Sequence, residues 1–319
     1  MGKTRKLAVL VPCLNEAEVI RETLERLEHA TAQCAGWSTE IVVVDDGSTD
    51  DTAAIVAAYN GTVGKAALRL VSLSRQFGHQ AALSAGLDSI DADATAIIDA
   101  DLQDPPEMIP DMLSLLDDGF DVVYGERDQR AGASWWRRLG YNSFYRLMRV
   151  LVGEVEIPAH VGDFRVMNRQ VTNALRAFPE KQRFLRGLVP YVGFRQVGIK
   201  YSRPARHAGE TKYSLTKLTS LALEGLVSFS SRPLRLALWS GLVMVILSGL
   251  GIVTVLVIRL ATDIWAPGWA TITTLILGFG GIQLFFIGVL GEYLGRVFLE
   301  VKGRPAYVVR GESPEQRSH

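Results

Sequence analysis

Two aspartates separated by one residue, Asp99 and Asp101, are the side chains in this sequence best suited to chemistry. The apolar run 94–98 before them is typical of a short buried strand, and two prolines follow, one of which can begin the next helix. Residues i and i+2 of an extended segment point the same way, so the two carboxylates can converge. A hard cation such as Mg²⁺ or Mn²⁺ takes such oxygen ligands, with water and substrate phosphates completing its shell. The stretch therefore predicts a metal site; the alternative is a solvated acidic loop.

The elements that must position these aspartates are apolar runs alternating with helical segments. Strand-like runs lie at 7–12, 41–44, 68–73, 94–98 and 121–125. Segments with helical character alternate with them at 17–30, 52–59 and 81–87. This alternation predicts βαβ units, and hence an α/β fold with a Rossmann-like, mainly parallel sheet.

Polar residues follow each predicted strand. They are Asn15 and Glu16, Asp45 and Asp46, the stretches 75–80 and 99–104, and Arg127. Because ligands bind at the carboxyl ends of strands in open α/β sheets, the loops together predict a nucleotide pocket. No Gly-x-Gly-x-x-Gly follows the first strand and no Walker sequence occurs, which excludes the usual dinucleotide fold and a P-loop enzyme.

The composition indicates a soluble part joined to an apolar part. The chain has 319 residues with 34 basic and 34 acidic side chains, so binding of nucleic acid through net charge is excluded. Mean hydropathy is +0.16 although 21% of residues are charged. Cys13 and Cys34 form neither a disulfide framework nor a metal-ligand spacing, which fits a reducing compartment. The first apolar run is too short for a signal peptide, so we expect the front of the chain in the cytoplasm.

Two long uncharged runs, 236–258 and 264–291, predict a transmembrane hairpin. Basic residues flank the pair at both outer ends, whereas the loop between them holds only Arg259, so both termini and the catalytic domain are expected on the cytoplasmic side of the cell (inner) membrane. The segment before the first span mixes leucines with polar residues and predicts an interfacial amphipathic helix; the alternative is an ordinary core helix. We therefore expect a domain at 1–214, an interfacial helix at 215–232, spans at about 236–258 and 269–291 within 233–295, and a cytoplasmic tail at 296–319.

Three motifs occur together at the predicted strand ends. They are Val-Pro-Cys-Leu-Asn-Glu at 11–16, Val-Val-Asp-Asp-Gly-Ser-Thr-Asp at 43–50 and Asp-Ala-Asp-Leu-Gln-Asp-Pro at 99–105. With the stretches 74–78, 162–165 and 206–214, the sequence resembles an inverting family 2 glycosyltransferase of the GT-A fold. It is most similar to the polyprenyl-phosphate glycosyltransferases, namely dolichol-phosphate mannose synthases and bacterial undecaprenyl-phosphate glucosyl- or aminoarabinosyl-transferases. The resemblance covers about 7–303; Cys13 and the pair Glu210–Thr211 depart from the commoner pattern.

The resemblance implies a role for individual residues. Asp99, Asp101 and Gln103 match positions that hold the metal or the sugar diphosphate, and Asp163, Asp101 and Arg206 match catalytic positions. The donor nucleotide is then bound by Pro12, Asn15, Glu16, Asp45, Asp46 and Gly78. For Pro12 simple turn geometry is an equal explanation. Arginine suits a phosphate because its forked donors carry a permanent charge, so the polyprenyl phosphate is expected to meet Arg127, Arg138, Arg165 and Arg206, with Lys212 behind them.

The expected reaction moves a sugar from a nucleotide sugar to a polyprenyl phosphate for glycan assembly, with UDP-glucose favoured over GDP-mannose and UDP-linked aminoarabinose. The second pKa of a phosphate monoester is about 6, so the acceptor is already largely ionised and needs a base less than a sugar hydroxyl does. Asp163 is either that base or a sugar ligand; beside Arg165 it is equally well a structural ion pair, because a neighbouring arginine lowers a carboxyl pKa. His79 and His207 are alternative bases.

Two other functions remain open from the residues. A processive polysaccharide synthase carries a Gln-x-x-Arg-Trp signature, which the stretch 182–186 does not match. A non-catalytic membrane scaffold or sugar-nucleotide sensor would not need Asp99, Asp101 and Gln103. The metal is expected to be either Mg²⁺ or Mn²⁺. The transmembrane helices offer a surface through which a homo-oligomer can form.

Overall fold

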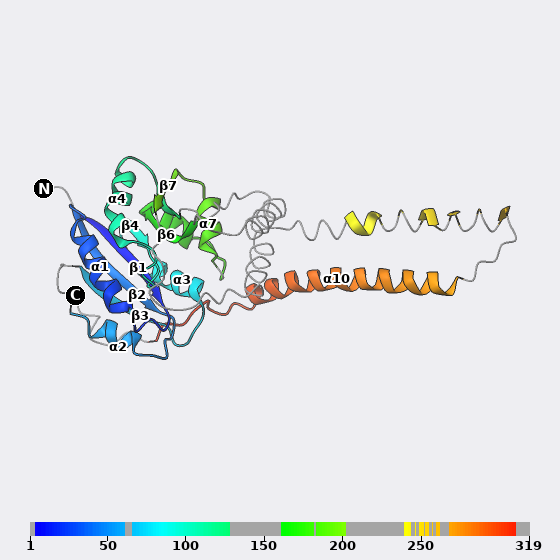
Figure 1. Ribbon diagram of the computed structural model, residues 1–319, viewed down its shortest axis with the longest axis horizontal. Coiled ribbons are helices and arrows are strands. Elements are labelled where there is room, and N and C mark those ends of the chain that lie inside the picture. Colours follow the sequence, from blue (N-terminus) through cyan, green and yellow to red (C-terminus); the bar gives the residue numbers. More distant parts are fainter. Residues whose placement is uncertain are drawn as a thin grey trace, which may run out of the picture. The chain divides into compact units, whose positions relative to one another are not determined.

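The computed structural model describes residues 4–60, 66–127, 161–181, 183–201 and 268–310, with scattered residues between 239 and 261 (Figure 1). The chain divides into two compact units. One comprises Met1–Trp135, Val155–Thr211 and Pro305–His319, and the other comprises Trp136–Glu154 and Lys212–Arg304. The first unit contains the whole sheet, so it is the unit that positions the predicted site.

A seven-stranded sheet with the order β3-β2-β1-β4-β6-β5-β7 forms the centre of the first unit. β6 runs antiparallel to its neighbours β4 and β5, and the other pairings are parallel, which confirms the mainly parallel sheet. The strands are β1 (Arg5–Cys13), β2 (Trp37–Asp45), β3 (Ala67–Ser72), β4 (Ala94–Ile97), β5 (Val122–Arg127), β6 (Val161–Asn168) and β7 (Gln196–Tyr201). The first five match the predicted runs, whereas the sequence patterns did not predict β6 and β7.

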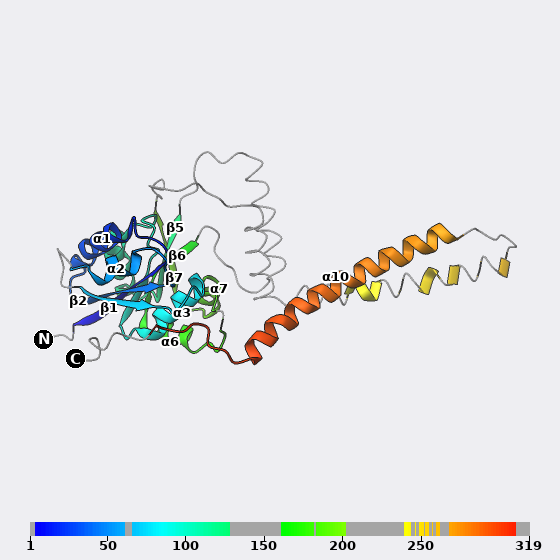
Figure 2. The same ribbon diagram turned by 90° about the horizontal axis from the view of Figure 1, so that it is seen from below.

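Helices cover both faces of this sheet (Figure 2). They are α1 (Ile20–Ala32), α2 (Thr52–Ala57), α3 (His79–Ser89), the 3₁₀ turn η1 (Pro106–Met108), α4 (Ile109–Asp117), α6 (Arg169–Arg176) and α7 (Leu185–Tyr191). η1 begins at a proline, as expected for the residue after the aspartate loop. A strand covered on both faces is apolar at consecutive positions, which is why 7–13 of β1 are all buried.

The two faces of β1 pack against different helices. Val9 and Val11 lie in the core cluster with Leu24 of α1. Leu10 faces the other way, where Gly86 of α3 packs so closely that a Cβ at this position would lie 2.0 Å from a Leu10 methyl carbon. This close packing holds the start of α3 near the carboxyl end of β1.

The C-terminal helix α10 (Trp269–Val301) is 33 residues long. Among the described residues it is the one helix long and apolar enough to cross a membrane, over Gly278–Val301. The predicted second span at 269–291 lies within α10, and the helix continues to Val301. The predicted first span at 236–258 is only partly described, and the predicted interfacial helix at 215–232 lies outside the described residues.

A short return segment, 305–310, follows α10 and belongs to the first unit. Val309 forms an antiparallel bridge with Leu73, just after β3. The Ser74 N–H donates to the carbonyl of Val308 at 2.8 Å, and the Arg310 N–H donates to that of Ser72 at 2.7 Å. The residues leading from β3 to α3 are therefore paired with the end of the described chain.

Candidate active site

The loops after β1 and β2 are bound to each other through Asn15. Its φ of 55° lies in the left-handed region, which asparagine tolerates better than most residues. Its backbone N–H donates to Ser48 Oγ at 2.9 Å, and its Oδ1 accepts from the Thr49 N–H at 2.8 Å. Asn15, predicted as a donor ligand, thus shapes the rim of the sheet through its own hydrogen bonds.

The two aspartates at the end of β2, Asp45 within the strand and Asp46 just after it, are buried and bind backbone N–H groups. Asp45 Oδ1 accepts from the Ser48 N–H at 2.9 Å. Asp46 accepts through both oxygens, from the N–H of Phe77 at 2.7 Å and from that of Gly78 at 2.9 Å. Gly78, with a φ of 107°, immediately precedes α3. Asp46 therefore fixes the loop from which α3 begins.

A pocket of ≈ 420 Å³ opens at the carboxyl ends of the first strands. The predicted site residues among those that line it are Pro12, Glu16, Asp46, Asp99 and Asp101. The sheet order brings these residues together from three separate motifs, and that they bind a nucleotide stays a prediction. His79 at the start of α3, which the sequence offered as an alternative base, and Arg186 on α7, which the sequence did not single out, also line it.

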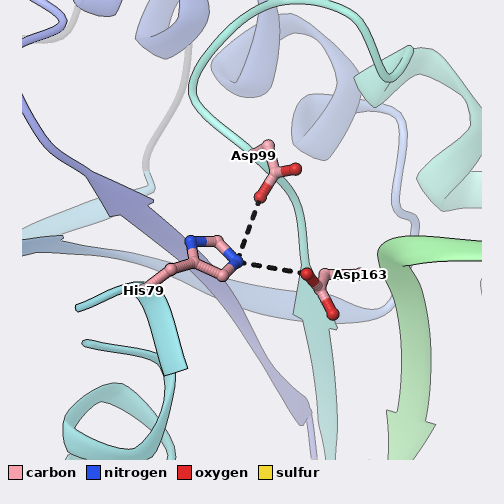
Figure 3. A group of neighbouring side chains, drawn as sticks. All are labelled: His79, Asp99 and Asp163. Carbon is pink, nitrogen blue, oxygen red and sulfur yellow. Dashed lines mark hydrogen bonds and ion pairs between the residues drawn. The ribbon is translucent and has the colours of Figure 1, made fainter. Parts of the chain in front are cut away.

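Asp99 follows β4 and has a buried oxygen, Oδ1, that lacks a hydrogen-bond partner among the described residues. His79 Nε2 lies 3.7 Å from this oxygen (Figure 3). Burial is the main reason why the pKa of Asp99 rises to about 6; the carboxylates of Asp163, Asp104 and Asp101 raise it further, while His79 opposes them. An unpartnered anionic oxygen in a pocket is a binding position for a cation.

Asp163, on β6, has a 1% exposed side chain and is surrounded by cationic groups. Arg186 donates to its two oxygens from Nε at 3.1 Å and from Nη2 at 2.7 Å, and His79 Nε2 lies 3.1 Å from Oδ2. Burial opposes ionisation, but these contacts and the charge of Arg165 outweigh it and hold the pKa of Asp163 well below its usual range. Burial likewise opposes protonation of His79, yet the hydrogen bond to Asp163 and the charge of Asp99 raise the pKa of the imidazole.

Three side chains offer ligand atoms that are close enough together to hold a divalent cation. One ligand atom each from His79, Asp99 and Asp163 lies within 4.8 Å of the others (Figure 3). Of these atoms, the unpartnered Asp99 oxygen is the one without a competing hydrogen bond. Asp101, predicted as a ligand, accepts from the Gln103 backbone N–H at 3.2 Å and from Gln103 Nε2 at 2.6 Å. Asp99 is thus common to the predicted ligand set and to the cluster in the structure.

Behind the aspartate loop, Asp104 is buried and accepts hydrogen bonds from Tyr201 Oη and Arg127. The Arg127 Nη2 lies 3.3 Å from Asp104 Oδ1, and Arg127 Nε donates to Tyr201 Oη at 3.0 Å. Gly162 allows this approach, because a Cβ there would lie 2.5 Å from Arg127 Nη2. Arg127, predicted to bind lipid phosphate, therefore connects the ends of β5 and β7 to the aspartate loop.

The other predicted phosphate ligands are placed differently. Arg165 is 2% exposed, and its guanidinium donates to the backbone carbonyls of Gly162 at 2.8 Å and Asp163 at 3.2 Å. The structure thus does not bring Arg165 to the pocket surface in the way a phosphate ligand requires. Arg138, Arg206, His207 and Lys212 lie outside the described residues.

Arg186 is the site residue that sequence reasoning missed. The segment 182–186 was compared only with the polysaccharide-synthase signature, which it does not match. No periodic pattern links it to Asp163, because the contact joins β6 to a helix 23 residues further along. The buried charge of Asp163 in a strand was the only available signal that a cation from elsewhere must approach it.

Comparisons with known proteins agree with this geometry. The model of the family described as glycosyl transferase family 2 matches residues 8–176. The uncharacterized glycosyltransferase YkcC of Bacillus subtilis is 39% identical over 97% of this chain and 95% of its own length. The SfII prophage-derived bactoprenol glucosyl transferase of Shigella flexneri is 36% identical over 96% of this chain and 97% of its own length.

A solved structure shares the fold. The crystal structure of glucosyl-3-phosphoglycerate synthase from Mycobacterium tuberculosis, in complex with Mn²⁺, UDP and glucosyl-3-phosphoglycerate, superposes with a TM-score of 0.50. It is 19% identical and covers 70% of this chain and 78% of its own. At that identity the likeness concerns the GT-A fold alone.

Proposed function

Because the chain belongs to glycosyl transferase family 2, we propose that this glycosyltransferase moves a sugar from a nucleotide sugar to a polyprenyl phosphate. The observation that carries the proposal is similarity along almost the whole chain, the apolar C-terminal part included, to a relative named as a bactoprenol glucosyl transferase. The same name favours a glucosyl donor, and we take UDP-glucose as the first candidate. GDP-mannose is the second.

We assign the donor to the pocket at the sheet edge. Pro12, Glu16 and Asp46 line it on the side of β1 and β2, and Asp99 and Asp101 line it on the side of β4. Asn15, Asp45 and Gly78 shape its rim through the hydrogen bonds described above. A volume of ≈ 420 Å³ lies within the range of small-molecule sites.

A divalent ion, Mg²⁺ or Mn²⁺, would be held by the free oxygen of Asp99, with Asp101 and Gln103 of the same loop beside it. When bound, such an ion neutralises charge that builds up on the leaving diphosphate. Asp104 supports the loop from behind, because Arg127 and Tyr201 fix its carboxylate.

The acceptor phosphate needs little help from a base. Its second pKa is about 6, so near neutral pH an oxygen of the phosphate attacks the anomeric carbon as the nucleotide diphosphate leaves from the opposite side, with inversion. The contacts that lower the pKa of Asp163 make its carboxylate a poor proton acceptor. We therefore assign Asp163 to positioning of its cationic neighbours. Arg138, Arg206 and Lys212 remain proposed ligands of the lipid phosphate, with Arg127 beside the aspartate loop.

The apolar C-terminal helix supports delivery of the acceptor from a bilayer. A polyprenyl tail stays in the hydrocarbon region, so only its phosphate has to reach the aqueous pocket. We propose two spans in the cell membrane, with the catalytic domain and both termini in the cytoplasm. Association of two or more chains through these helices is also proposed.

Membranes from cells that express the chain provide the direct test. They are incubated with labelled UDP-glucose, GDP-mannose or UDP-aminoarabinose, with undecaprenyl phosphate or undecaprenol, and with Mn²⁺, Mg²⁺ or a chelator. We expect label in the lipid extract from UDP-glucose and undecaprenyl phosphate, dependent on the metal, with the anomeric configuration inverted. The Asp101→Asn variant should be folded and inactive.

Each other outcome contradicts a defined part of the proposal. If only GDP-mannose gives labelled lipid, the donor is GDP-mannose and not UDP-glucose. If the label is found in a polymer, the protein is a processive synthase. If undecaprenol accepts the sugar as readily as undecaprenyl phosphate does, the proposal that the acceptor is a polyprenyl phosphate is wrong. No transfer from any donor, or full activity of Asp101→Asn, favours a non-catalytic scaffold.

A further inference from the structure

Arg186 is the pocket residue whose position the reaction has not yet explained. It comes from α7, and its side chain is 40% exposed although that of its partner Asp163 is 1% exposed. The guanidinium therefore has one edge against a buried carboxylate and another edge toward the pocket that it lines. An arginine needed only to neutralise Asp163 would not require this second edge.

Asp163 determines the orientation of that guanidinium. Arg186 Nε and Nη2 donate to the two different oxygens of Asp163, at 3.1 and 2.7 Å. This fork fixes the plane of the group, and the carboxylate is itself fixed because β6 lies between β4 and β5. A guanidinium has five N–H donors, so the fork leaves the remaining donors available on the same rigid group.

The charges around the pocket indicate what those donors bind. Glu16, Asp46, Asp99 and Asp101 all line it, and a single metal ion offsets only part of their charge. Among the described residues that line it, Arg186 is the one with a permanent positive charge; the other basic group, His79, is a titratable imidazole. Within the part of the chain that the structure describes, Arg186 is therefore the fixed cation of this pocket that a phosphate-bearing substrate can meet.

We propose that Arg186 binds phosphoryl oxygens of a substrate in this pocket and that Asp163 is the positioning residue that aims it. The inference rests on the proposed function and deepens it. The ligand chemistry is a phosphate oxygen, which can belong to the diphosphate of the donor or to the monophosphate of the acceptor. Arg186 forms charge-assisted hydrogen bonds to it, and no proton is transferred.

The experiment measures binding of the donor side without turnover. Uridine, UMP and UDP are titrated calorimetrically into the detergent-solubilised full chain with Mn²⁺, for the wild type, Arg186→Gln and Arg186→Lys. If Arg186 meets the terminal phosphate of the donor, Arg186→Gln weakens UDP about 10- to 100-fold and leaves uridine unchanged, and Arg186→Lys is intermediate because it keeps the charge but not the fork. In the acceptor arm, the KM for a short-chain polyprenyl phosphate is measured at saturating donor.

Two further variants separate positioning from loss of folding. Asp163→Asn keeps the size of the side chain but removes its charge, so it should reproduce part of the Arg186→Gln effect, and the double variant should add little to Arg186→Gln. Arg69→Gln breaks an arginine–carboxylate pair with Glu40 that lies away from the pocket, 2.8 Å across, and should change neither UDP affinity nor acceptor KM.

Each outcome bears on the inference. A weaker UDP complex with unchanged acceptor KM supports the donor source, and a rise of about tenfold or more in acceptor KM with unchanged UDP affinity supports the acceptor source. If both stay within twofold of the wild type while Arg186→Gln remains folded by circular dichroism, Arg186 only neutralises Asp163 and the proposal is overturned. If the wild type forms no lipid-linked product, the proposed function fails, and the UDP arm still tests Arg186.

Discussion

The loops after β2 and β4 lie at the same edge of one sheet and both present paired carboxylates, yet the two loops use them in opposite ways. Asp46, after β2, is 2% exposed and accepts a backbone N–H through each oxygen. Asp99, after β4, has a buried oxygen that accepts none from the described residues. The first loop is complete without a ligand, whereas in the second loop Asp99 Oδ1 accepts no hydrogen bond from the described residues and has only the more distant charge of His79 Nε2, 3.7 Å away, beside it.

The difference shows where the protein gives up stability for function. Backbone donors around Asp46 satisfy its carboxylate and order the loop from which α3 begins. Asp99 Oδ1 receives no such donor from the described residues, and burial raises the pKa of the carboxyl group to about 6. A carboxylate with such a buried oxygen destabilises the folded protein, and the proposed metal ion would remove this cost. Under the proposed function, two similar aspartate motifs therefore have different roles: one builds the pocket and the other binds the metal ion in it.

The largest expected effect comes from removing the negative charge of Asp99. Asp99→Asn keeps the shape of the side chain but supplies a weaker metal ligand, so transfer to polyprenyl phosphate should fall by roughly 100-fold or more. The measurement is initial rate of lipid labelling at saturating donor and Mn²⁺. Activity within a factor of three of the wild type would show that the two loops do not differ in the way proposed.

The same variant should be more stable than the wild type in the absence of metal, with a defined pH dependence. Because the folded state raises the pKa of Asp99 from 3.8 to about 6, it binds a proton more tightly than the unfolded chain does. This group therefore makes the free energy of unfolding fall as the pH rises from about 4 to about 6, by roughly 3 kcal/mol, and causes no further change above that.

Denaturation at a series of pH values, with a chelator present, measures this effect. The stability gained by Asp99→Asn should grow across that window and level off near neutral pH, and Mn²⁺ should stabilise the wild type much more than the variant. Asp163 acts in the opposite direction in both proteins, because its lowered pKa contributes stability that is lost as the pH falls. Equal stability of wild type and variant at pH 7 without metal would contradict the interpretation that the buried Asp99 carboxylate destabilises the folded protein.

The sequence allowed the fold to be predicted where its residues follow simple patterns. The runs that became β1 to β5 are apolar because helices cover both faces of the sheet, and the polar exit loops follow from parallel strands that end at one edge. β6 was not predicted, because Asp163 and Arg165 interrupt its apolar pattern; both are buried, and their partners come from other parts of the chain.

The roles of the individual carboxylates were harder to predict for a related reason. The spacing of Asp99 and Asp101 indicates oxygen ligands at a strand end, and the structure brings both to the pocket. The two carboxylates differ in their hydrogen bonds. Backbone N–H groups of another loop reach both oxygens of Asp46, whereas no described donor reaches Asp99 Oδ1. Asp46 receives such donors from residues 31 and 32 positions along the chain, a distance over which the sequence carries no periodic signal.

A third prediction tests the building role of Asp46. In Asp46→Asn one oxygen becomes an NH₂ group, which cannot accept from the N–H of Phe77 or Gly78, so a partly buried donor loses its partner at a cost of about 1 kcal/mol. We expect a lower melting temperature both with and without metal, together with weaker UDP binding because the loop before α3 loosens. If the variant melts like the wild type and loses only metal binding, Asp46 binds the metal ion, as proposed for Asp99, and does not shape the loop.

The smallest expected effect concerns the return segment 305–310. This segment pairs with the residues after β3 that lead into the loop held by Asp46. Tyr307 Oη donates to Asp88 Oδ2 at 2.9 Å, and Arg183 Nη1 donates to the other oxygen of Asp88 at 2.7 Å. Tyr307→Phe removes the first bond and leaves the carboxylate paired with Arg183, so the loss should be about 1 kcal/mol. The backbone pairing of Val308 and Arg310 is unaffected by the change, so UDP affinity and metal dependence should stay as in the wild type.

Thermal melting and UDP titration of the same preparations test this, with Tyr191→Phe as the matched control because that side chain is 62% exposed. The control should melt like the wild type. If Tyr307→Phe instead weakens UDP binding tenfold, the loop held by Asp46 depends on the return segment for its shape, since Ser72 and Ser74, which pair with that segment, directly precede it. The loop after β2 would then need the return segment to keep its shape, and it would differ less from the loop that carries Asp99 than the hydrogen bonds of Asp46 indicate.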